Sequence, residues 1–215
     1  MHHRPLPPTP AHAGRALIVV GLCLLAGCGG NKADWSAPAE YARRTSEDLA
    51  RAQDLARQAQ RAEDEGRADE AIGLYREAVA AYHDFPAAWN NLGRLLMNSG
   101  EALDAATAFR AAADISPADP RPMYNLGELW RQRGYLDDTA RYYTEALDRD
   151  ENYLPALREA IFVDRHLRLR TDEVVARRIR RALLLETDPA WRDFFEREKI
   201  RVETDPRAPS WGVGN

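Results

Sequence analysis

The chain has 215 residues, of which 45% are hydrophobic, and this is enough for one modest domain with a hydrophobic core. Charged residues make up 30% and the formal net charge is only -4, a balance that argues against a polybasic nucleic-acid-binding protein. Alanine and arginine dominate the middle of the chain, and no run alternates Val, Ile or Thr with polar residues. The composition therefore predicts helices rather than strands.

The N-terminal segment differs from the rest of the chain. Its first 15 residues contain two arginines and no acid, and an apolar run, ALIVVGLCLLAGC, follows at residues 16–28. This run is too short for a comfortable membrane span, and it fits the hydrophobic region of a secretory signal peptide. An export signal is therefore predicted at this end.

The apolar run ends in Leu25-Ala26-Gly27-Cys28, which resembles the lipobox of bacterial lipoproteins. The resemblance implies a signal peptide at 1–27, lipid attached to Cys28, and a tether at 28–37. Gly29 rather than aspartate follows the cysteine, which by the same resemblance implies the outer membrane, with the domain facing the periplasm. An ordinary cleaved signal peptide or an uncleaved anchor is the alternative interpretation. A chain beginning at Cys28 has no second cysteine and can form no internal disulfide.

A period of 34 residues runs through the middle of the chain. Four series show it: Gly66, Gly100 and Gly134; Ala59, Gly93 and Gly127; Tyr75, Phe109 and Tyr143; Ala78, Ala112 and Ala146. A fixed period of this length indicates stacked supersecondary units. Within each unit, the first glycine series ends a helix. The small residues of the second series leave room for the paired helix.

Between Trp89 and Pro117 the pattern Trp-x2-Leu-Gly, Ala-x3-Phe-x2-Ala and Pro resembles the tetratricopeptide repeat. The resemblance implies an all-α fold, a right-handed α-solenoid of helix-turn-helix units. We expect units at 52–85, 86–119 and 120–153, and a degenerate unit at 154–187. The third unit departs from the pattern at Thr139 and Glu151, and the first at Gln58 and His83.

The fourth unit loses the turn glycine, because Arg168 stands in its place. Its second helix is shifted by about two residues, so that Ala182 is the counterpart of Ala146. Degeneration is expected at the end of an array, where a unit has no neighbour. Three flanking segments complete the prediction: a leading helix at 38–51, a capping helix at 188–202 that begins at Thr187 or Asp188, and a disordered tail at 203–215.

The sequence does not predict an enzyme. Beyond the signal peptide only His83 and His166 remain, in different units, and Cys28 is committed to lipid. Acidic clusters such as EDEGRADE are typical of solvated turns rather than paired catalytic acids. No glycine-rich phosphate loop and no His/Cys metal spacing occurs, so neither a cofactor nor a metal is expected.

Binding of a protein or peptide is the better hypothesis, because the first helices of stacked units line a concave face. Subtracting core positions leaves these candidates: Asn90, Arg94 and Met97; Tyr124, Glu128 and Arg131; Arg158, Phe162 and Arg165; with Asn91 and Asn125 beside them. In peptide-binding members of the family an asparagine here hydrogen-bonds the ligand backbone, and leucine and glycine packing does not require it. The alternative is that each is merely a polar residue on a wet helix face.

A clamp for a C-terminal carboxylate is not predicted. It would need lysine or arginine one unit beyond each asparagine. The corresponding positions hold Arg121 and Asn125 in one case, and Pro155 and Glu159 in the other. Half of such a clamp is present at best.

The arginine-rich segment 158–181 is a second candidate surface, for anionic lipid headgroups or an acidic partner. The alternative interpretation of this segment is a solvated helix face whose positive charges are balanced by Asp172 and Glu173. Together these patterns predict a lipid-anchored scaffold or assembly factor of the bacterial cell envelope that binds no nucleic acid. Two alternatives stay open: a self-associating, homo-oligomeric envelope protein, and a docking subunit that regulates a cell-wall enzyme.

Overall fold

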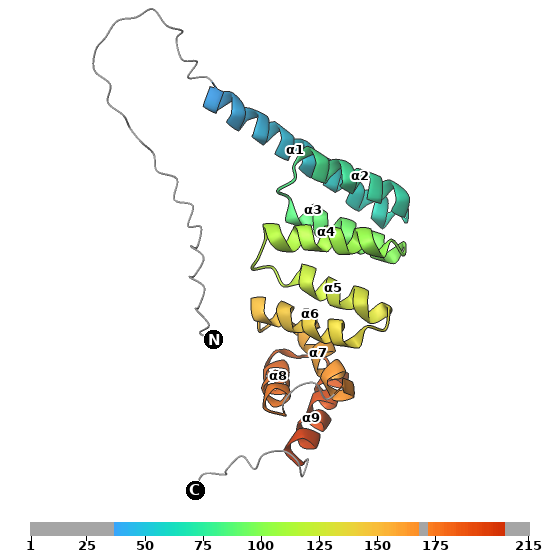
Figure 1. The fold of residues 1–215 in the computed structure, drawn as a ribbon, viewed down its shortest axis with the longest axis vertical. Coiled ribbons are helices and arrows are strands. Elements are labelled where there is room, and N and C mark those ends of the chain that lie inside the picture. Colours follow the sequence, from blue (N-terminus) through green and yellow to red (C-terminus); the bar gives the residue numbers. More distant parts are fainter. Residues whose placement is uncertain (1–36, 168–171, 205–215) are drawn as a thin grey trace, which may run out of the picture.

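The computed structural model describes residues 37–167 and 172–204, and these ranges form helices joined by short turns (Figure 1). The helices are α1 (Ala37–Asp64), α2 (Ala68–Ala81), α3 (Pro86–Asn98), α4 (Ala102–Ile115), α5 (Arg121–Gln132), α6 (Leu136–Arg149), α7 (Leu154–Leu167), α8 (Asp172–Leu185) and α9 (Pro189–Thr204). Consecutive helices pair and the pairs stack along one axis, with α9 at the C-terminal end. The predicted all-α solenoid is confirmed.

The repeated turn glycines end the first helix of each of the first three pairs. Gly100 has a φ of 84°, a left-handed conformation that other residues rarely adopt. Its N–H donates to the Met97 carbonyl at 3.1 Å, and the next N–H, of Glu101, donates to the Leu96 carbonyl at 2.9 Å. These two bonds form the Schellman motif, which satisfies carbonyls at the helix end. Gly66 and Gly134 repeat the same arrangement.

The second glycine series lets an aromatic ring lie directly on the neighbouring helix. A Cβ added to Gly93 would lie 2.7 Å from the Phe109 ring, and one added to Gly127 would lie 2.5 Å from the Tyr143 ring. Both rings are fully buried. Alternating small and large side chains therefore lock α3 to α4 and α5 to α6.

Buried side chains form two clusters along the stack. The first joins α1 to α6 around Tyr75, Leu96 and Phe109, and the second joins α6 to α9 around Ile161 and Phe195, with Met123 packed against both. The first cluster lies in the regular repeats, whereas the second includes the degenerate unit and the final helix. Each part of the array thus has its own core, as expected for units that contact mainly their neighbours.

The fourth pair and α9 close the C-terminal end. Ala146 and Ala182 are both fully buried in the second cluster, in agreement with a shift of α8 by two residues. Asp188 caps α9, because its Oδ1 accepts the Ala190 N–H at 2.8 Å and the Trp191 N–H at 3.2 Å.

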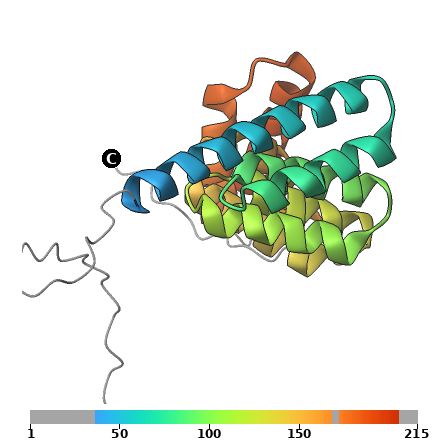
Figure 2. The same cartoon turned by 90° about the horizontal axis from the view of Figure 1, so that it is seen from above.

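The expected leading helix and the first helix of the array form one helix of 28 residues, α1. Its N-terminal half extends beyond α2 in both views (Figures 1 and 2). The signal peptide, Cys28, the start of the tether and residues 205–215 lie outside the described residues. No helix in the described ranges combines the length and apolarity needed to span a membrane.

Candidate binding groove

The predicted groove residues lie on α3, α5 and α7, the first helices of three successive pairs. Two of them are not freely available on the surface. Asn90 is only 8% exposed, and the partly buried Met97 side chain packs against the N-terminal hydrophobic cluster. The burial of Asn90 argues against a direct surface contact there, whereas the half-buried Met97 stays a prediction. Their positions alternate with the leucines, and sequence spacing did not show how closely α3 and α5 approach.

The two asparagines of the repeated motif hold neighbouring helices together. The Asn125 amide donates to Asn90 Oδ1 at 2.9 Å, which joins α5 to α3. The Asn91 amide donates to the Tyr75 hydroxyl at 3.1 Å, which joins α3 to α2. The leucine and glycine packing does not require these asparagines, but each of them also bonds a neighbouring helix. The side-chain carbonyls of Asn91 and Asn125 accept no hydrogen bond from the described residues and stay available to a ligand N–H.

The arginines predicted on the groove are all engaged by acids of this chain. The ion pairs are Arg94–Glu63, Arg131–Glu128 at 2.7 Å, Arg158–Glu186 at 2.7 Å and Arg165–Glu198 at 3.1 Å. Glu186 and Glu198 lie in the link before α9 and on α9 itself, outside the 34-residue period. Repeat periodicity therefore offered no signal for these partners. The charges on this face balance internally, so the face is not a cationic surface for an acidic ligand.

An aromatic cluster surrounds Tyr124 on α5. Its ring stacks on Tyr143 with centroids 5.7 Å apart and meets Tyr153 edge-on at 5.6 Å. Burial raises the pKa of Tyr124 and of Tyr143, so both phenols stay protonated at neutral pH. The Tyr143 hydroxyl donates to Glu128 Oε1. Tyr124 is therefore a packed residue at the edge of the groove rather than a free contact.

Glu159 on α7 lies beside this cluster. It is half-buried, and among the described residues it forms no ion pair. Burial, followed by the negative charge of Glu128, raises the pKa of the Glu159 carboxyl. One turn along α7, Phe162 is 44% exposed, the largest exposure of an apolar side chain in the predicted set.

A hollow of about 360 Å³ lies at the N-terminal end of the groove, between α1 and α3. Its polar lining comes from Gln53, Gln60, Tyr75, Asn91 and Arg57, whose charge is paired with Asp54 at 2.9 Å, and its apolar lining from Ala56, Phe85, Ala87 and Ala88. With the carbonyl of Asn125 and the ring of Phe162, the face combines amide hydrogen-bonding groups with small apolar surfaces. This chemistry suits an uncharged peptide segment better than a metal or a carboxylate. Within the described ranges no three His, Cys, Asp or Glu side chains are grouped to hold a metal.

Comparison with known proteins agrees with this architecture. Residues 56–120 match the family model of the tetratricopeptide repeat. No curated protein sequence matches the chain. A thermophilic TPR protein of Thermus thermophilus is similar in structure, with a TM-score of 0.52 and 20% identity over 70% of this chain and 82% of that one.

Two further solved structures share the fold. The first TPR domain of Spaghetti (RPAP3), bound to an HSP90 peptide, has a TM-score of 0.52 and 18% identity over 56% of this chain and 95% of that one. An O-GlcNAc transferase of Thermobaculum terrenum has a TM-score of 0.56 and 21% identity over 66% of this chain, but only 27% of the transferase. Residues 56–120 thus match the tetratricopeptide-repeat model, and the described chain has the solenoid fold of these solved structures.

Proposed function

We propose that this chain is a lipid-anchored scaffold of a bacterial cell envelope that binds an extended peptide segment of a partner protein in its concave groove. The observation that carries the proposal is the internal pairing of the groove arginines, beside the side-chain carbonyls of Asn91 and Asn125 and the exposed ring of Phe162. The Spaghetti domain, which has the same fold, was solved with a bound peptide. A protein-interaction scaffold is the general role that this fold supports.

Crosslinking in envelopes, followed by recovery of this chain with its partners, tests the groove. Phe162→Ala removes an exposed aromatic contact, and we expect partner binding to weaken about tenfold, as for other aromatic anchors of interfaces. Leu103→Ala is the matched control, because Leu103 is 83% exposed and lies on α4, away from the groove helices. An identical set of partners with Phe162→Ala would contradict the groove.

The ionic strength dependence provides a second check on the same site. Because the arginines are paired internally, raising the salt concentration from ~0.05 to ~0.5 M should change the affinity less than about twofold. A steep loss of affinity with salt would mean that the groove arginines contact the ligand directly.

The lipid anchor belongs to the same proposal and rests on the Leu25-Ala26-Gly27-Cys28 motif. We expect the chain to incorporate a labelled fatty acid and to fractionate with membranes, and Cys28→Ala to abolish the label. A variant that stays fully membrane-bound, with neither form labelled, would remove the lipoprotein part of the proposal and leave the groove unaffected. Fractionation of inner from outer membranes then tests the expectation from Gly29.

A further inference from the structure

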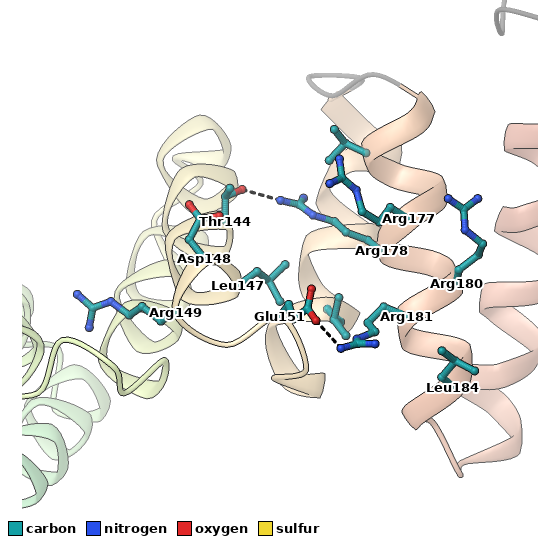
Figure 3. Close-up of a pocket in the computed structure, with 12 residues that line it drawn as sticks. Thr144, Leu147, Asp148, Arg149, Glu151, Arg177, Arg178, Arg180, Arg181 and Leu184 are labelled. Atoms are coloured by element: carbon teal, nitrogen blue, oxygen red, sulfur yellow. Dashed lines mark hydrogen bonds and ion pairs between the residues drawn. The ribbon is translucent and has the colours of Figure 1, made fainter. Parts of the chain in front are cut away.

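A cavity of about 820 Å³ lies away from the groove, between the second helices α6 and α8 (Figure 3). Val174 and Leu184 of α8 supply accessible apolar surface, and Leu184 is 77% exposed. Leu147 and Leu157 line the cavity from α6 and α7 as buried side chains. A cavity of this size with apolar walls falls within the range of small-ligand pockets.

The cavity lies where α8 departs from the repeat. In the three preceding units, a turn that contains glycine precedes the second helix, which is α2, α4 or α6. The four residues between α7 and α8, 168–171, include no glycine. At the equivalent junction between α2 and α4, the hollow has a volume of only about 200 Å³. Another hollow, of about 660 Å³, lies along α4 beside His83 and Asp84. The cavity between α6 and α8 differs from both in its larger volume and in the arginines of α8 that line it.

One arginine holds the two walls of this cavity in place. Arg178 is 8% exposed, pairs with the buried Asp164 at 2.6 Å, and donates to Thr144 Oγ1 across the gap at 2.9 Å. Arg178 lies four residues before the buried Ala182 of α8. Four residues before the buried Ala146 of α6 and Ala112 of α4, the chain carries Tyr142 and Ala108, which are also buried. The ion pair and the hydrogen bond of Arg178 thus replace apolar packing at this junction, and the long arginine side chain keeps α8 apart from α6.

Two other arginines of the α8 wall have unused hydrogen-bonding capacity. Arg177 is exposed and forms no ion pair with a described residue. Arg181 pairs with Glu151, a residue whose side chain is 74% exposed, but its buried Nε has no acceptor in the described part of the chain. Figure 3 shows Arg177 and Arg178 side by side on α8, whereas Arg149 points away from α8.

The acids of the cavity lie on the opposite side. Asp148 is on α6, and Glu151 is in the turn that follows α6. An anion would therefore be repelled from the α6 wall and attracted to the α8 wall, and it would compete with Glu151 for Arg181. Val174 and Leu184 place accessible apolar surface on the same α8 wall.

We propose that the cavity between α6 and α8 binds a single-chain amphiphilic anion. Its carboxylate or phosphate head contacts Arg177 and Arg181, and its alkyl chain lies on Val174 and Leu184. A wall with both cationic and apolar surface selects a molecule that carries both kinds of group. A walled cavity between three helices favours such a ligand over a flat membrane surface. This site is separate from the peptide groove and does not depend on the groove's function.

Calorimetric titration of the 215-residue chain tests this, with laurate and dodecyl phosphate as probes below their micelle concentrations. Both should bind at one site; a preference for laurate would assign the fatty-acid class, and a preference for dodecyl phosphate the lysolipid class. Arg181→Gln should weaken binding about tenfold, the size of one charge-assisted hydrogen bond. Arg177→Gln, at an exposed position, should act in the same direction without disturbing the fold.

Two matched variants sharpen the test. Glu151→Gln removes the competing carboxylate, so it should strengthen binding several-fold, whereas a purely structural role for the Arg181–Glu151 pair predicts no gain. Arg197→Gln removes an equal charge from an exposed ion pair on α9 and should leave binding unchanged. Circular dichroism of each variant checks that the helices persist.

Three outcomes would overturn the proposal. Equal binding of dodecanol or dodecyltrimethylammonium would show that the arginines do not select an anion. Equal binding of inorganic phosphate would show that the apolar surface plays no part. Binding of an acidic helical peptide, with no binding of either amphiphile, would assign the cavity to a macromolecular partner instead.

Discussion

Gly93 and Gly100 belong to the same helical pair, but different physical requirements exclude other residues at the two positions. At Gly100 the backbone itself is the constraint, since a φ of 84° disfavours any side chain although nothing lies within 4 Å of an added Cβ. At Gly93 the backbone is helical and the constraint is the Phe109 ring. The first requirement is local, whereas the second belongs to the contact between α3 and α4.

Substitution by alanine separates these requirements experimentally. We expect Gly93→Ala to lower the free energy of unfolding by about 1–3 kcal/mol, because the added methyl group meets a fully buried ring that cannot move aside. Gly73→Ala is the control, since Gly73 lies inside α2 with nothing within 4 Å of an added Cβ. There alanine should stabilise by up to about 1 kcal/mol. Denaturant unfolding of both variants decides the point, and equal effects would contradict the steric account.

Sequence periodicity predicted the packing residues well and the polar ones poorly. The residue types at Gly93, Phe109 and Ala112 recur at intervals of 34 residues because the two helices of each unit pack together in the same way. The bond from Asn125 to Asn90 depends instead on the distance between two helices, and the residue aligned with Asn125 in the next unit is Glu159. A contact that occurs only once in the molecule produces no 34-residue pattern in the sequence.

At the scale of elements, the link between α8 and α9 is organised by one buried carboxylate. Glu186 is 3% exposed, and its oxygens accept two hydrogen bonds at 2.7 Å from Arg158 on α7. The same side chain accepts the backbone N–H groups of Thr187 and Asp188 at 3.0 and 2.9 Å. One side chain therefore fixes the turn into α9 and joins it to α7.

This arrangement gives the last helix a defined response to acid. The hydrogen bonds from Arg158 lower the pKa of Glu186 below its ordinary value of 4.5. A lowered folded-state pKa means that the stabilisation is complete above about pH 4.5 and is lost as the pH falls through the folded-state value. We expect Glu186→Gln to destabilise the protein by about 3–5 kcal/mol at neutral pH, as for other buried pairs that lose one partner.

Thermal unfolding between about pH 3 and pH 7 measures both effects. The stability of the Glu186→Gln protein should fall less steeply below about pH 4.5 than that of the original chain. Glu47→Gln serves as a control, since Glu47 forms an ion pair with Arg43 in which both side chains are more than half exposed. Parallel pH profiles for the original chain and Glu186→Gln would contradict the assigned role.

On the scale of the whole molecule, the array has two hydrophobic clusters rather than one continuous core. Tyr75, Leu96 and Phe109 belong to the first, and Ile161 and Phe195 to the second. The second contains the displaced α8 and depends on α9 to cover it. The units of a repeat array contact mainly their neighbours, so the two ends of the stack need not unfold together.

Hydrogen exchange of the native protein tests this division. Phe195 is fully buried, and Phe195→Ala should cost about 3–5 kcal/mol within the C-terminal cluster. Exchange should accelerate in α7, α8 and α9 while protection in α3 and α4 is retained. A uniform loss of protection along the whole chain would show that the array unfolds as a single unit.

The first helix projects well beyond the repeat that it joins. Only the part of α1 from about residue 52 packs within the first repeat, and residues 42–51 leave almost all of their side chains exposed. At 1.5 Å per residue, the 15 residues from 37 to 51 extend α1 by about 22 Å. The array therefore ends in a single projecting helix, and no other described helix covers the sides of residues 42–51.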